Sequence, residues 1–448
     1  MESDARAGVA DFLAEAVRRK PERLAMVSPE RAWSYAELSA DVDRRAAELS
    51  LDGVGPGKVH PVTLEPDARG IRTLLAVWRL GATAAPLNPR LTGAERHQAV
   101  QVLEGAGPGA QAILWTSGTS GRPRGVALSA DNLRSSARAA AVRLALGPDD
   151  VWLASLSVAH VGGIALVARS LMLGGVLAAW GRFTAASASA LIEGWGTPQG
   201  AGVRLTHLSL VPTQLLQLLE ERSGAPPPET FRCALVGGAH APPDLVGRAL
   251  GEGWPLALTY GMTEMTSQVA TSPPRRVGAK PGSVGLPLDG TELRVAPDGE
   301  VLVRGATLAL GYVGTATSLS DGEGWYHTGD LGRVDGEGDL WITGRRSDRI
   351  VSGGVNVDPH EVEAVLRAHP AVRDACVVAL PDERWGEVVG AALVTSGGEA
   401  DVDALAEWAR ERLSAAKRPR RWLVMAGLPL NANGKVDRGA VRREMLGS

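Results

Sequence analysis

Cysteine is scarce in this sequence. Only two cysteines occur among the 448 residues, Cys233 and Cys376, and they lie far apart. There is no CxxC pair and no cysteine or histidine spacing typical of a structural zinc site. These absences exclude a disulfide framework, and a chain without disulfides fits the reducing cytosol. We therefore expect a cytoplasmic protein.

Long uninterrupted hydrophobic runs are also missing. The most apolar stretch, residues 161–180, has Arg169 near its centre. An arginine in the middle of a membrane costs about 2.5 to 3.5 kcal/mol, so this stretch predicts a buried helix rather than a membrane span. Residues 1–20 lack the apolar segment of a signal peptide. We expect neither membrane insertion nor secretion.

Neither sign of charge predominates. The chain has 47 basic and 50 acidic residues, interspersed, and a formal net charge of −3. This pattern offers no basic face to a nucleic acid, which excludes that class of partner. Lysine itself is rare, with five lysines against 42 arginines. Arginine replaces lysine well on solvated surfaces but poorly where a compact, movable ammonium is needed, so each retained lysine is of interest.

Short strands alternate with helices in the first two thirds of the chain. Apolar runs at residues 112–115, 151–156, 208–211 and 234–236 are bounded by Gly, Ser or Pro, as buried parallel strands are. Residues 212–222 and 241–250 lie between such runs and have helical patterns. The alternation predicts an α/β fold, with a large N-terminal domain of βαβ-type sheets and helices.

The pattern changes after residue 282 to alternating, glycine-punctuated segments, which predict antiparallel hairpins with turns at 298–299 and 336–338. A helix should begin at Pro359, with Asp358 as N-cap and Glu361 completing a capping box. Two strands and a helix follow. We expect a distorted antiparallel β subdomain and then a small α+β domain, with domains at residues 1–346 and 347–448.

Two familiar nucleotide-binding patterns are absent. Residues 53–58 end in Gly57-Lys58 but lack the first glycine and the final Ser or Thr of a P-loop. No GxGxxG follows a predicted strand, so a dinucleotide site of the Rossmann type has no support. Residues 53–58 are better explained as a surface turn.

A Ser/Thr/Gly-rich loop directly follows the predicted strand at 112–115. Residues 115–125 hold four hydroxyl side chains and three glycines, and Arg124 adds positive charge. Backbone N–H and hydroxyl groups of such a loop can converge on an anion, although this composition alone is also typical of a plain turn. The candidate phosphate-binding residues are Thr116, Ser117, Gly118, Thr119, Ser120, Gly121 and Arg124.

This whole string resembles the phosphate loop of the acyl-adenylate-forming enzymes, the superfamily of acyl-CoA synthetases, luciferases and peptide-synthetase adenylation domains. Four more of the family's motifs follow in order: TYGMTE at 259–264, WYHTGD at 325–330, GR at 344–345 and PLNANGKVDR at 429–438. The resemblance therefore covers nearly the whole chain. The ATP-binding residues that it implies beyond the phosphate loop are Gly238, Ala239, Tyr260, Gly261, Asp330 and Arg345.

The resemblance also implies a two-step reaction. A carboxylate attacks the α-phosphorus of ATP, and a thiol then attacks the acyl-AMP. Bringing two anions together needs neutralising charge, which the mobile ammonium of Lys435 supplies. Thr263 contacts phosphate, and Glu264 beside a polyphosphate requires a cation between them, so Mg²⁺ is expected. His160 completes the implied catalytic residues.

For the second step the resemblance implies a C-terminal domain that swings about a hinge at Ser347 and Asp348. Gly353 and Gly354 match the segment that faces the pantetheine of CoA, where glycine permits close approach. The chain departs from the family pattern at Arg124, where lysine is usual, and at Val355, where many relatives have glutamate. Residues 91–110 are also shorter than in many relatives.

Substrate choice is expected in the larger domain. SLVPTQL, the Gly-Gly-Ala turn and YGMTEMTSQV look most like the o-succinylbenzoate:CoA ligases of menaquinone biosynthesis. That acid has two carboxylates and a ring, so polar donors among apolar walls are expected. The candidate pocket residues are His160, His207, Ser209, Thr213, Gly237, Gly261 and Met262. A hydrogen-bonded core or helix-capping role is the alternative for His207, Ser209 and Thr213.

Three other functions stay open at this point: another aryl- or medium-chain acyl-CoA synthetase, an adenylation domain that loads a carrier protein, and an inactive relative that acts as a binding module. Retention of Glu264, Asp330, Arg345 and Lys435 disfavours the last. The expected small molecules are ATP, Mg²⁺, CoA and a carboxylic acid, and the sequence leaves the oligomeric state open.

Overall fold

The computed structural model describes residues 8–107, 109–117, 123–196, 202–395, 401–431 and 435–447. Its chain divides into two compact units. The first comprises Met1–Leu293, Val303–Tyr326 and Gly336–Leu340, and the second comprises Arg294–Leu302, His327–Asp335 and Trp341–Ser448. The boundary predicted between residues 346 and 347 stays a prediction, and each unit is described separately below.

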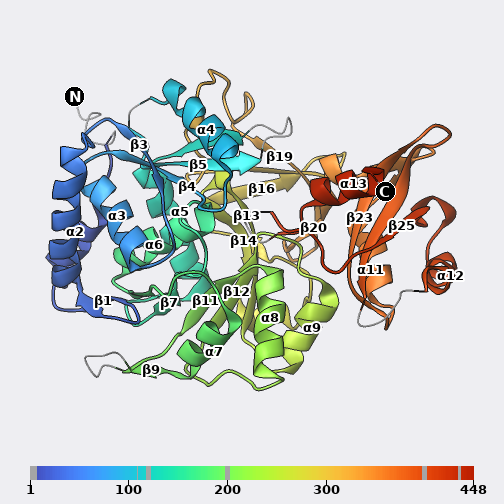
Figure 1. The fold of residues 1–448 in the computed structure, drawn as a ribbon, viewed down its shortest axis with the longest axis horizontal. Coiled ribbons are helices and arrows are strands. Elements are labelled where there is room, and N and C mark those ends of the chain that lie inside the picture. The colour runs from blue at the N-terminus through green and yellow to red at the C-terminus, as the bar shows by residue number, and fades with distance from the viewer. Residues whose placement is uncertain are drawn as a thin grey trace. The chain divides into compact units, whose positions relative to one another are not determined.

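The larger sheet of the first unit, which includes several of the predicted pocket residues, can be followed in Figure 1. In the described part of the chain it has nine strands, in the order β15-β14-β13-β12-β11-β7-β8-β1-β2. Their bounds are β1 Leu24–Val27, β2 Ala32–Ser34, β7 Val151–Leu153, β8 Val176–Ala178, β11 His207–Leu210, β12 Cys233–Gly237, β13 Leu256–Met262, β14 Ser267–Ser272 and β15 Leu286–Pro287. Strands β8, β7, β11, β12 and β13 run parallel, so their carboxyl ends meet at one edge.

A second sheet of this unit has the order β18-β6-β5-β4-β3. The bounds are β3 Val59–Thr63, β4 Thr83–Leu87, β5 Ala112–Ser117, β6 Pro123–Leu128 and β18 Gly311–Tyr312. Strand β5 is parallel to β4 but antiparallel to β6, so the prediction of a purely parallel strand here is wrong on one side. The reason is that β6, the next strand in the sequence, pairs with β5 antiparallel along its whole length, from Ala112 opposite Leu128 to Ser117 opposite Pro123.

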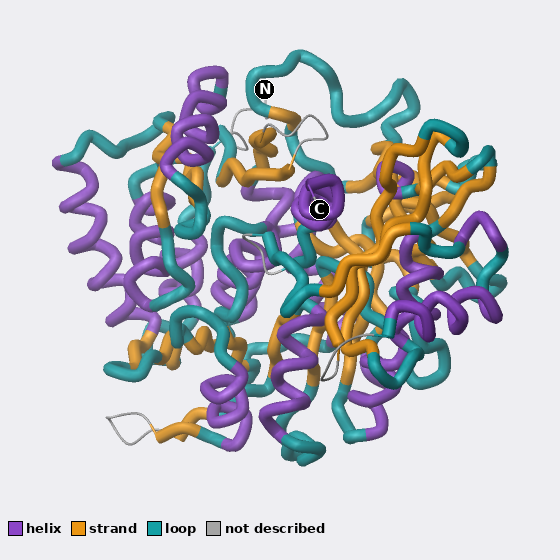
Figure 2. The backbone as a smooth tube through the Cα atoms, turned by 45° about the vertical axis from the view of Figure 1, so that its right-hand side comes forward, coloured by secondary structure: helices purple, strands orange, loops and turns teal. Residues whose placement is uncertain are grey.

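Helices pack around these two sheets, purple beside orange strands in Figure 2. Their bounds are α1 Phe12–Arg19, α2 Tyr35–Leu51, α3 Ala68–Arg79, α4 Gly93–Val102, α5 Ala130–Leu144, α6 Val161–Leu173, α7 Ala185–Glu193, α8 Pro212–Arg222, α9 Pro243–Gly251 and α10 Pro274–Val277. Local sequence sets several ends: Ser34 and Glu37 form a capping box at α2, and Gly174 ends α6 in the left-handed conformation. Two hydrophobic clusters of buried side chains fill the space between helices and sheets.

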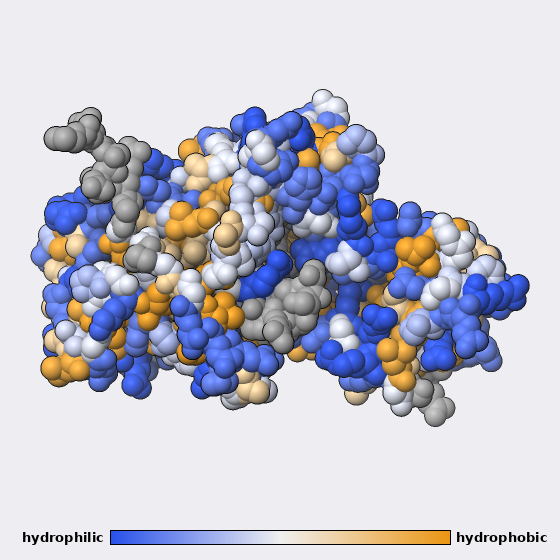
Figure 3. Space-filling model, turned by 90° about the horizontal axis from the view of Figure 1, so that it is seen from above, coloured by the Kyte–Doolittle hydropathy of each residue, from blue (hydrophilic) through white to orange (hydrophobic). Residues whose placement is uncertain are grey.

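Most predicted elements are confirmed, with shifts at their ends. Helix α8 has the predicted bounds, and the apolar stretch at 161–180 is a buried helix, α6, followed by strand β8. The strand predicted at 151–156 ends earlier, at Leu153. No described helix has the length and apolar character needed to span a bilayer. Figure 3 shows hydrophilic and hydrophobic residues interspersed on one face.

The β-rich part of the chain has a four-stranded sheet in the order β16-β17-β19-β20. These strands are Thr291–Val295, Glu300–Gly305, Tyr326–Val334 and Leu340–Arg345. The predicted turns lie between β16 and β17 and between β19 and β20, where Gly299 and Gly338 have φ of 88° and 85°. The hairpin prediction is therefore confirmed at both turns.

The second unit also contains a sheet formed by β22-β21-β24-β23, with β25 beside β24. Its strands are β21 Ile350–Ser352, β22 Val355–Val357, β23 Val372–Asp382, β24 Gly386–Thr395 and β25 Arg421–Val424, and its helices are α11 Pro359–Arg367, α12 Val402–Arg412 and α13 Arg438–Gly447. Helix α11 begins at Pro359 as predicted, but the capping box is wrong. Asp358 accepts from the amide of His360, while Glu361 pairs with Lys417 at 2.6 Å.

Candidate active site

The carboxyl edge of the nine-stranded sheet brings together several of the predicted acid- and nucleotide-binding residues. His160 lies in the loop after β7, Thr213 in the first turn after β11, Gly238 and Ala239 after β12, and residues 260–264 at the end of β13. Ligands of open α/β sheets bind at this edge, because loops from neighbouring parallel strands converge there. The topology thus brings together residues that lie about 100 positions apart in the sequence.

Two of the predicted pocket glycines are required by the backbone itself. A Cβ at Gly261 would lie 1.8 Å from the carbonyl oxygen of Ser267, and a Cβ at Gly237 would lie 2.5 Å from Cγ2 of Thr259. Both glycines therefore let β12, β13 and β14 approach closely at the carboxyl edge. Their part in binding the acid or ATP stays a prediction.

His160 is the N-cap residue of α6, where its ring makes no capping bond to the helix backbone. Its Nε2 lies 3.4 Å from Nδ2 of Asn88, a buried side chain at the end of β4. The contact orients the imidazole from the neighbouring sheet. His160 is thereby held at the carboxyl edge, beside the loops that carry the other candidates.

His207 lies elsewhere. It begins β11, opposite Trp152 and Cys233 in the register, three residues before the carboxyl end of its strand. Its ring stacks on Trp152 with centroids 4.6 Å apart, and its Nδ1 lies 2.8 Å from Oγ1 of Thr206. Burial, with a smaller effect of Arg169, lowers the pKa of His207 to about 3, so the ring is neutral. The structure does not bring His207 to the carboxyl edge.

Ser209 and Thr213 occupy intermediate positions. Ser209 is buried within β11, and its carbonyl oxygen accepts from the hydroxyl of Ser155 at 2.6 Å. Thr213 lies in the first turn of α8, after the N1 proline at 212. Met262 ends β13 as the N-cap residue of the short 3₁₀ helix η2, Thr263–Met265. A pocket role for these three residues stays a prediction.

Glu264 is a buried carboxylate in η2 with one hydrogen-bond partner for its side chain. Oη of Tyr312 donates to Oε1 at 2.9 Å, and Oε2 has no protein partner within the described ranges. The following residues, Thr266 and Ser267, have φ of 51° and 94°, a strained conformation for residues other than glycine. The hydroxyl of Thr266 donates to the carbonyl of Thr307 at 2.7 Å, which holds the strained turn in place.

The residues around Glu264 fit Mg²⁺ bound together with a nucleotide. Among the described residues, no group of three or more histidine, cysteine, aspartate or glutamate side chains could hold a metal ion by itself. Mg²⁺ is commonly held by one or two carboxylates with substrate phosphates and water supplying the other oxygens. A single buried carboxylate with one free oxygen is such a donor.

The phosphate-loop strands place Thr116 directly opposite Arg124 in the β5–β6 register. Oγ1 of Thr116 is buried and has no hydrogen-bond partner among the residues that the structure describes. A buried hydroxyl without a partner is uncommon, which makes Oγ1 of Thr116 a candidate contact for a ligand. The predicted residues Gly118, Thr119, Ser120 and Gly121 lie outside the described residues, as does the side chain of Ser117.

The second unit brings together three residues predicted from separate motifs. Nε of Arg345 donates to Oδ1 of the buried Asp330 at 2.6 Å. Lys435 lies within electrostatic reach of both, and burial, followed by the positive charge of Arg345, lowers its pKa. The backbone N–H of Lys435 donates to Oδ1 of Asn431 at 3.1 Å. An ammonium therefore lies beside the pair that is predicted to hold ribose.

Gly353 and Gly354 form the two-residue turn between β21 and β22, with φ of 57° and 82°. Two positive φ values are what a tight hairpin of this length requires. A Cβ at Gly353 would also lie 2.5 Å from the ring of Trp385. The hairpin and Trp385 explain Gly353 without a ligand, whereas the space around Gly354 is open. Ser347 and Asp348, the predicted hinge, lie in the 3₁₀ helix η3, Arg346–Asp348.

Arg169 is the residue that sequence reasoning missed, because it served only to exclude a membrane span. It is 5% exposed, and its guanidinium lies 4.5 Å from the Trp152 ring centroid and donates to Oε1 of Gln268 at 3.3 Å. Its Nε has no acceptor, and the side chain pairs with no carboxylate in the described ranges. Gln268 is the cross-strand neighbour of Gly261, whereas Trp152, on which the guanidinium lies, stacks on His207. A charged residue inside an apolar stretch was the available signal.

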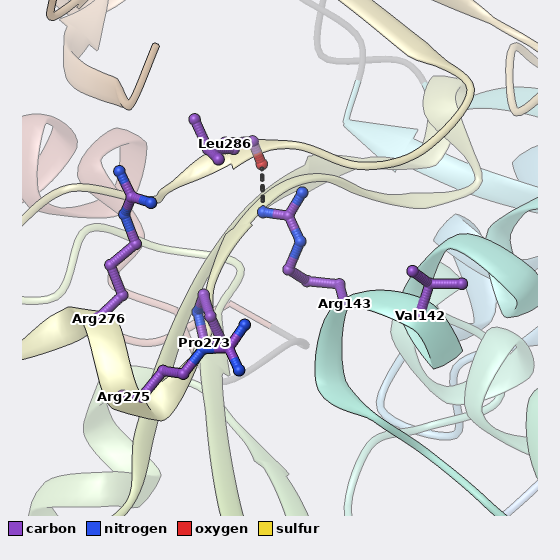
Figure 4. A pocket seen from close by; sticks show the side chains of 6 residues that line it. All are labelled: Val142, Arg143, Pro273, Arg275, Arg276 and Leu286. Atoms are coloured by element: carbon purple, nitrogen blue, oxygen red, sulfur yellow. Dashed lines mark hydrogen bonds between the residues drawn. The ribbon is translucent and has the colours of Figure 1, made fainter. Parts of the chain in front are cut away.

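A separate cleft of about 300 Å³ is lined by Val142, Arg143, Pro273, Arg275, Arg276 and Leu286. The Arg143 guanidinium donates to the carbonyl oxygens of Leu286, Thr271 and Pro287, and Figure 4 shows the first of these bonds. Its charge thus fixes β14 and β15 to α5. None of the predicted site residues lines this cleft.

Comparison with known proteins gives two family matches along the chain. The AMP-binding enzyme family matches residues 13–105 and 110–313, and the AMP-binding enzyme C-terminal domain matches residues 361–435. The 2-succinylbenzoate–CoA ligase of Bacillus subtilis is 31% identical, over 96% of this chain and 97% of that relative.

Solved structures give the same result. The o-succinylbenzoate CoA synthetase (MenE) of Bacillus subtilis in complex with the acyl-adenylate OSB-AMP has a TM-score of 0.86 and 30% identity, covering 96% of this chain and 98% of that one. Its complex with ATP and a magnesium ion has a TM-score of 0.85 and 31% identity, covering 96% and 98%. A variant of E. coli MenE with bound OSB-AMS has a TM-score of 0.81 and 28% identity, covering 97% and 98%.

Proposed function

The chain belongs to the AMP-binding enzyme family, and from this premise we propose that it is an ATP-dependent 2-succinylbenzoate:CoA ligase of menaquinone biosynthesis. One carboxylate of the acid attacks the α-phosphorus of ATP, which forms acyl-AMP and releases pyrophosphate. The thiol of CoA then attacks the acyl carbonyl, which forms the thioester and releases AMP. The proposed reaction uses ATP, Mg²⁺ and CoA, as the predictions from the motifs require.

The meeting of Lys435, Asp330 and Arg345 in the second unit carries this proposal. The Asp330 carboxylate accepts from the ribose hydroxyls, and Arg345 fixes that carboxylate. The ammonium of Lys435 then lies near the nucleotide, where it neutralises the attacking carboxylate and the α-phosphate. Burial, followed by the positive charge of Arg345, lowers the pKa of this ammonium.

The first unit supplies the phosphate contacts in this proposal. Thr116 Oγ1, which has no protein acceptor or donor in the described ranges, bonds to a phosphate oxygen, and Arg124 lies directly opposite Thr116 in the sheet. Glu264 would hold Mg²⁺ through its free oxygen, and the ion would stabilise charge on the departing pyrophosphate.

The buried Arg169, which donates to Gln268 opposite Gly261, supports a dicarboxylic acid as the substrate. A buried cation without an anion is unfavourable, so a substrate carboxylate that reaches it gains a charge-assisted bond in a site of low dielectric. In 2-succinylbenzoate the carboxylate that is not activated is such a group. A monocarboxylic acid would leave the guanidinium unpaired, and this difference favours 2-succinylbenzoate over a plain aryl or medium-chain acid.

The test is a panel of carboxylic acids assayed for acid-dependent pyrophosphate release, with and without CoA. We expect release with 2-succinylbenzoate that requires Mg²⁺, and a CoA thioester when CoA is present. A larger response to monocarboxylic aryl acids would favour another acyl-CoA synthetase, and activity only with a carrier protein would favour an adenylation domain. No pyrophosphate release with any acid would favour the inactive relative.

A further inference from the structure

Tyr312 links the phosphate loop to the predicted magnesium ligand. The guanidinium carbon of Arg124 lies 4.4 Å from the centroid of the Tyr312 ring, and the hydroxyl of the same residue donates to Oε1 of Glu264 at 2.9 Å. One side chain thus contacts a cation on its ring face and a carboxylate at its hydroxyl. Neither the strands predicted from the sequence nor the family motifs indicated this contact.

The pairing of β18 with β6 produces this arrangement. Tyr312 lies opposite Val126, and Arg124 is two residues before Val126 on the same strand. Residues two apart in a strand face the same side, as do residues directly opposite each other, so Arg124 and Tyr312 are diagonal neighbours on one face. Thr116, opposite Arg124, shares that face. Arg124 on β6 therefore lies between Tyr312 on β18 and Thr116 on β5.

Arginine at position 124 suits this contact better than lysine does. A planar guanidinium stacks on an aromatic face, whereas a compact, strongly hydrated ammonium does so less well. Arg124 is exposed and forms no ion pair with a carboxylate in the described part of the chain, so stacking leaves its charge available for phosphate. The arginine that replaces the family's usual lysine at position 124 therefore contacts a specific aromatic ring, that of Tyr312.

We propose that Tyr312 is a positioning residue for MgATP: its hydroxyl orients Glu264 toward the metal and its ring holds Arg124 toward the phosphates. This inference rests on the proposed function, because it takes Glu264 as the magnesium ligand. Oε1 already accepts from the tyrosine hydroxyl, so Oε2 is the oxygen of Glu264 that has no protein partner in the described ranges. Oη of Tyr326 lies 3.4 Å from Oη of Tyr312 and adds a second hydroxyl contact to the arrangement.

The test measures nucleotide binding by titration calorimetry on the full-length protein in the absence of acid and CoA. We expect Tyr312→Phe, which keeps the ring, to raise the Mg²⁺ concentration needed for half-maximal ATP binding roughly tenfold, the effect of losing one hydrogen bond to a charged group. Binding of ATP without Mg²⁺ should change less than about twofold. An unchanged Mg²⁺ requirement would overturn the hydroxyl's role.

The ring is tested by a double-mutant cycle with Tyr312→Leu and Arg124→Lys. We expect Tyr312→Leu to weaken metal-free ATP binding about fivefold in the natural background and less than twofold in the Arg124→Lys background. The effect is smaller in the second background because the ring acts on ATP binding through its contact with Arg124. Equal losses in both backgrounds would overturn the link between Tyr312 and Arg124.

Tyr35→Phe is the matched control. Its hydroxyl is also buried in the first unit and donates to the carbonyl of Gly175 at 2.7 Å, distant in sequence from every predicted site residue of the loop. We expect a similar drop in thermal stability and no change in the Mg²⁺ requirement, and a raised requirement here would overturn the specific role of Tyr312. If the unsubstituted protein bound no MgATP, the proposed function itself would fail, which distinguishes the two outcomes.

Discussion

Substitution of Arg169 by methionine should reduce use of 2-succinylbenzoate while leaving the fold intact. The side chain is 5% exposed, its pKa is lowered to about 10 by burial, and it therefore carries a positive charge at neutral pH. Its contacts are the Trp152 ring and one 3.3 Å bond to Gln268. Methionine is shorter than arginine but keeps a flexible apolar stem, and it removes the charge.

The expected magnitude follows from these contacts. Truncating one partner of a buried charge pair costs about 2 to 5 kcal/mol, and because Gln268 remains as a polar neighbour we expect about 3 kcal/mol, or roughly 150-fold in kcat/KM. For the fold, removing a buried charge that lacks a protein counter-ion offsets the loss of about 1 kcal/mol from the Gln268 bond. The free energy of unfolding should therefore change by less than about 1 kcal/mol.

The assay compares two acids in both proteins by acid-dependent pyrophosphate release. The second acid is the analogue of 2-succinylbenzoate in which the carboxyl that is not activated is replaced by hydrogen. We expect the substitution to affect the dicarboxylate roughly 150-fold and the analogue less than about threefold, and Arg169→Lys to fall between. An equal loss for both acids, or a large fall in unfolding free energy, would refute the reasoning.

Three further predictions concern the second unit. Lys435→Ala should slow acyl-AMP formation more than about 100-fold and leave thioester formation from supplied acyl-AMP within about threefold. Rapid-quench assays of the two half-reactions measure both rates. Equal losses in the two rates would contradict the prediction. Because the pKa of Lys435 is lowered, its proton is lost as pH rises through a value below the ordinary 10.5. The rate of acyl-AMP formation at saturating ATP should therefore decline with a midpoint at that pH. A flat profile up to pH 10.5 would contradict a role for the Lys435 ammonium in this step. In denaturant unfolding, Gly353→Ala should destabilise the protein by about 2 to 4 kcal/mol and Gly354→Ala by about 1 kcal/mol. Both positions have a positive φ that is unfavourable for alanine, but only a Cβ at position 353 would also clash with Trp385. Equal effects of the two substitutions would show that Trp385 is not the cause.

Linear patterns predicted much of this protein because each depends on neighbouring residues. The α8 helix and the start of α11 follow from local proline and capping preferences, and the turns at Gly299 and Gly338 follow from glycine's tolerance of positive φ. The capping box at Glu361 failed because a competing partner, Lys417, comes from a distant segment. The chemistry of the motifs was likewise readable, since each motif keeps its residues within one loop.

Contacts between distant segments decided the rest. His207 has the same local pattern as a pocket residue, but its register opposite Trp152 places it in the core. Arg169 became a candidate for recognising the second carboxylate only when burial and the absence of a carboxylate among its described neighbours were known.

The sequence by itself determined the reaction class, the nucleotide motifs and the retention of Lys435 in a chain with few lysines. The tertiary structure decided which side chains share a face, as with Arg124 and Tyr312, which lie 188 positions apart, and which charges lack partners. The physical reason is that backbone preferences act over a few residues, whereas desolvation and pairing of charges depend on whatever the folded chain places within a few ångströms.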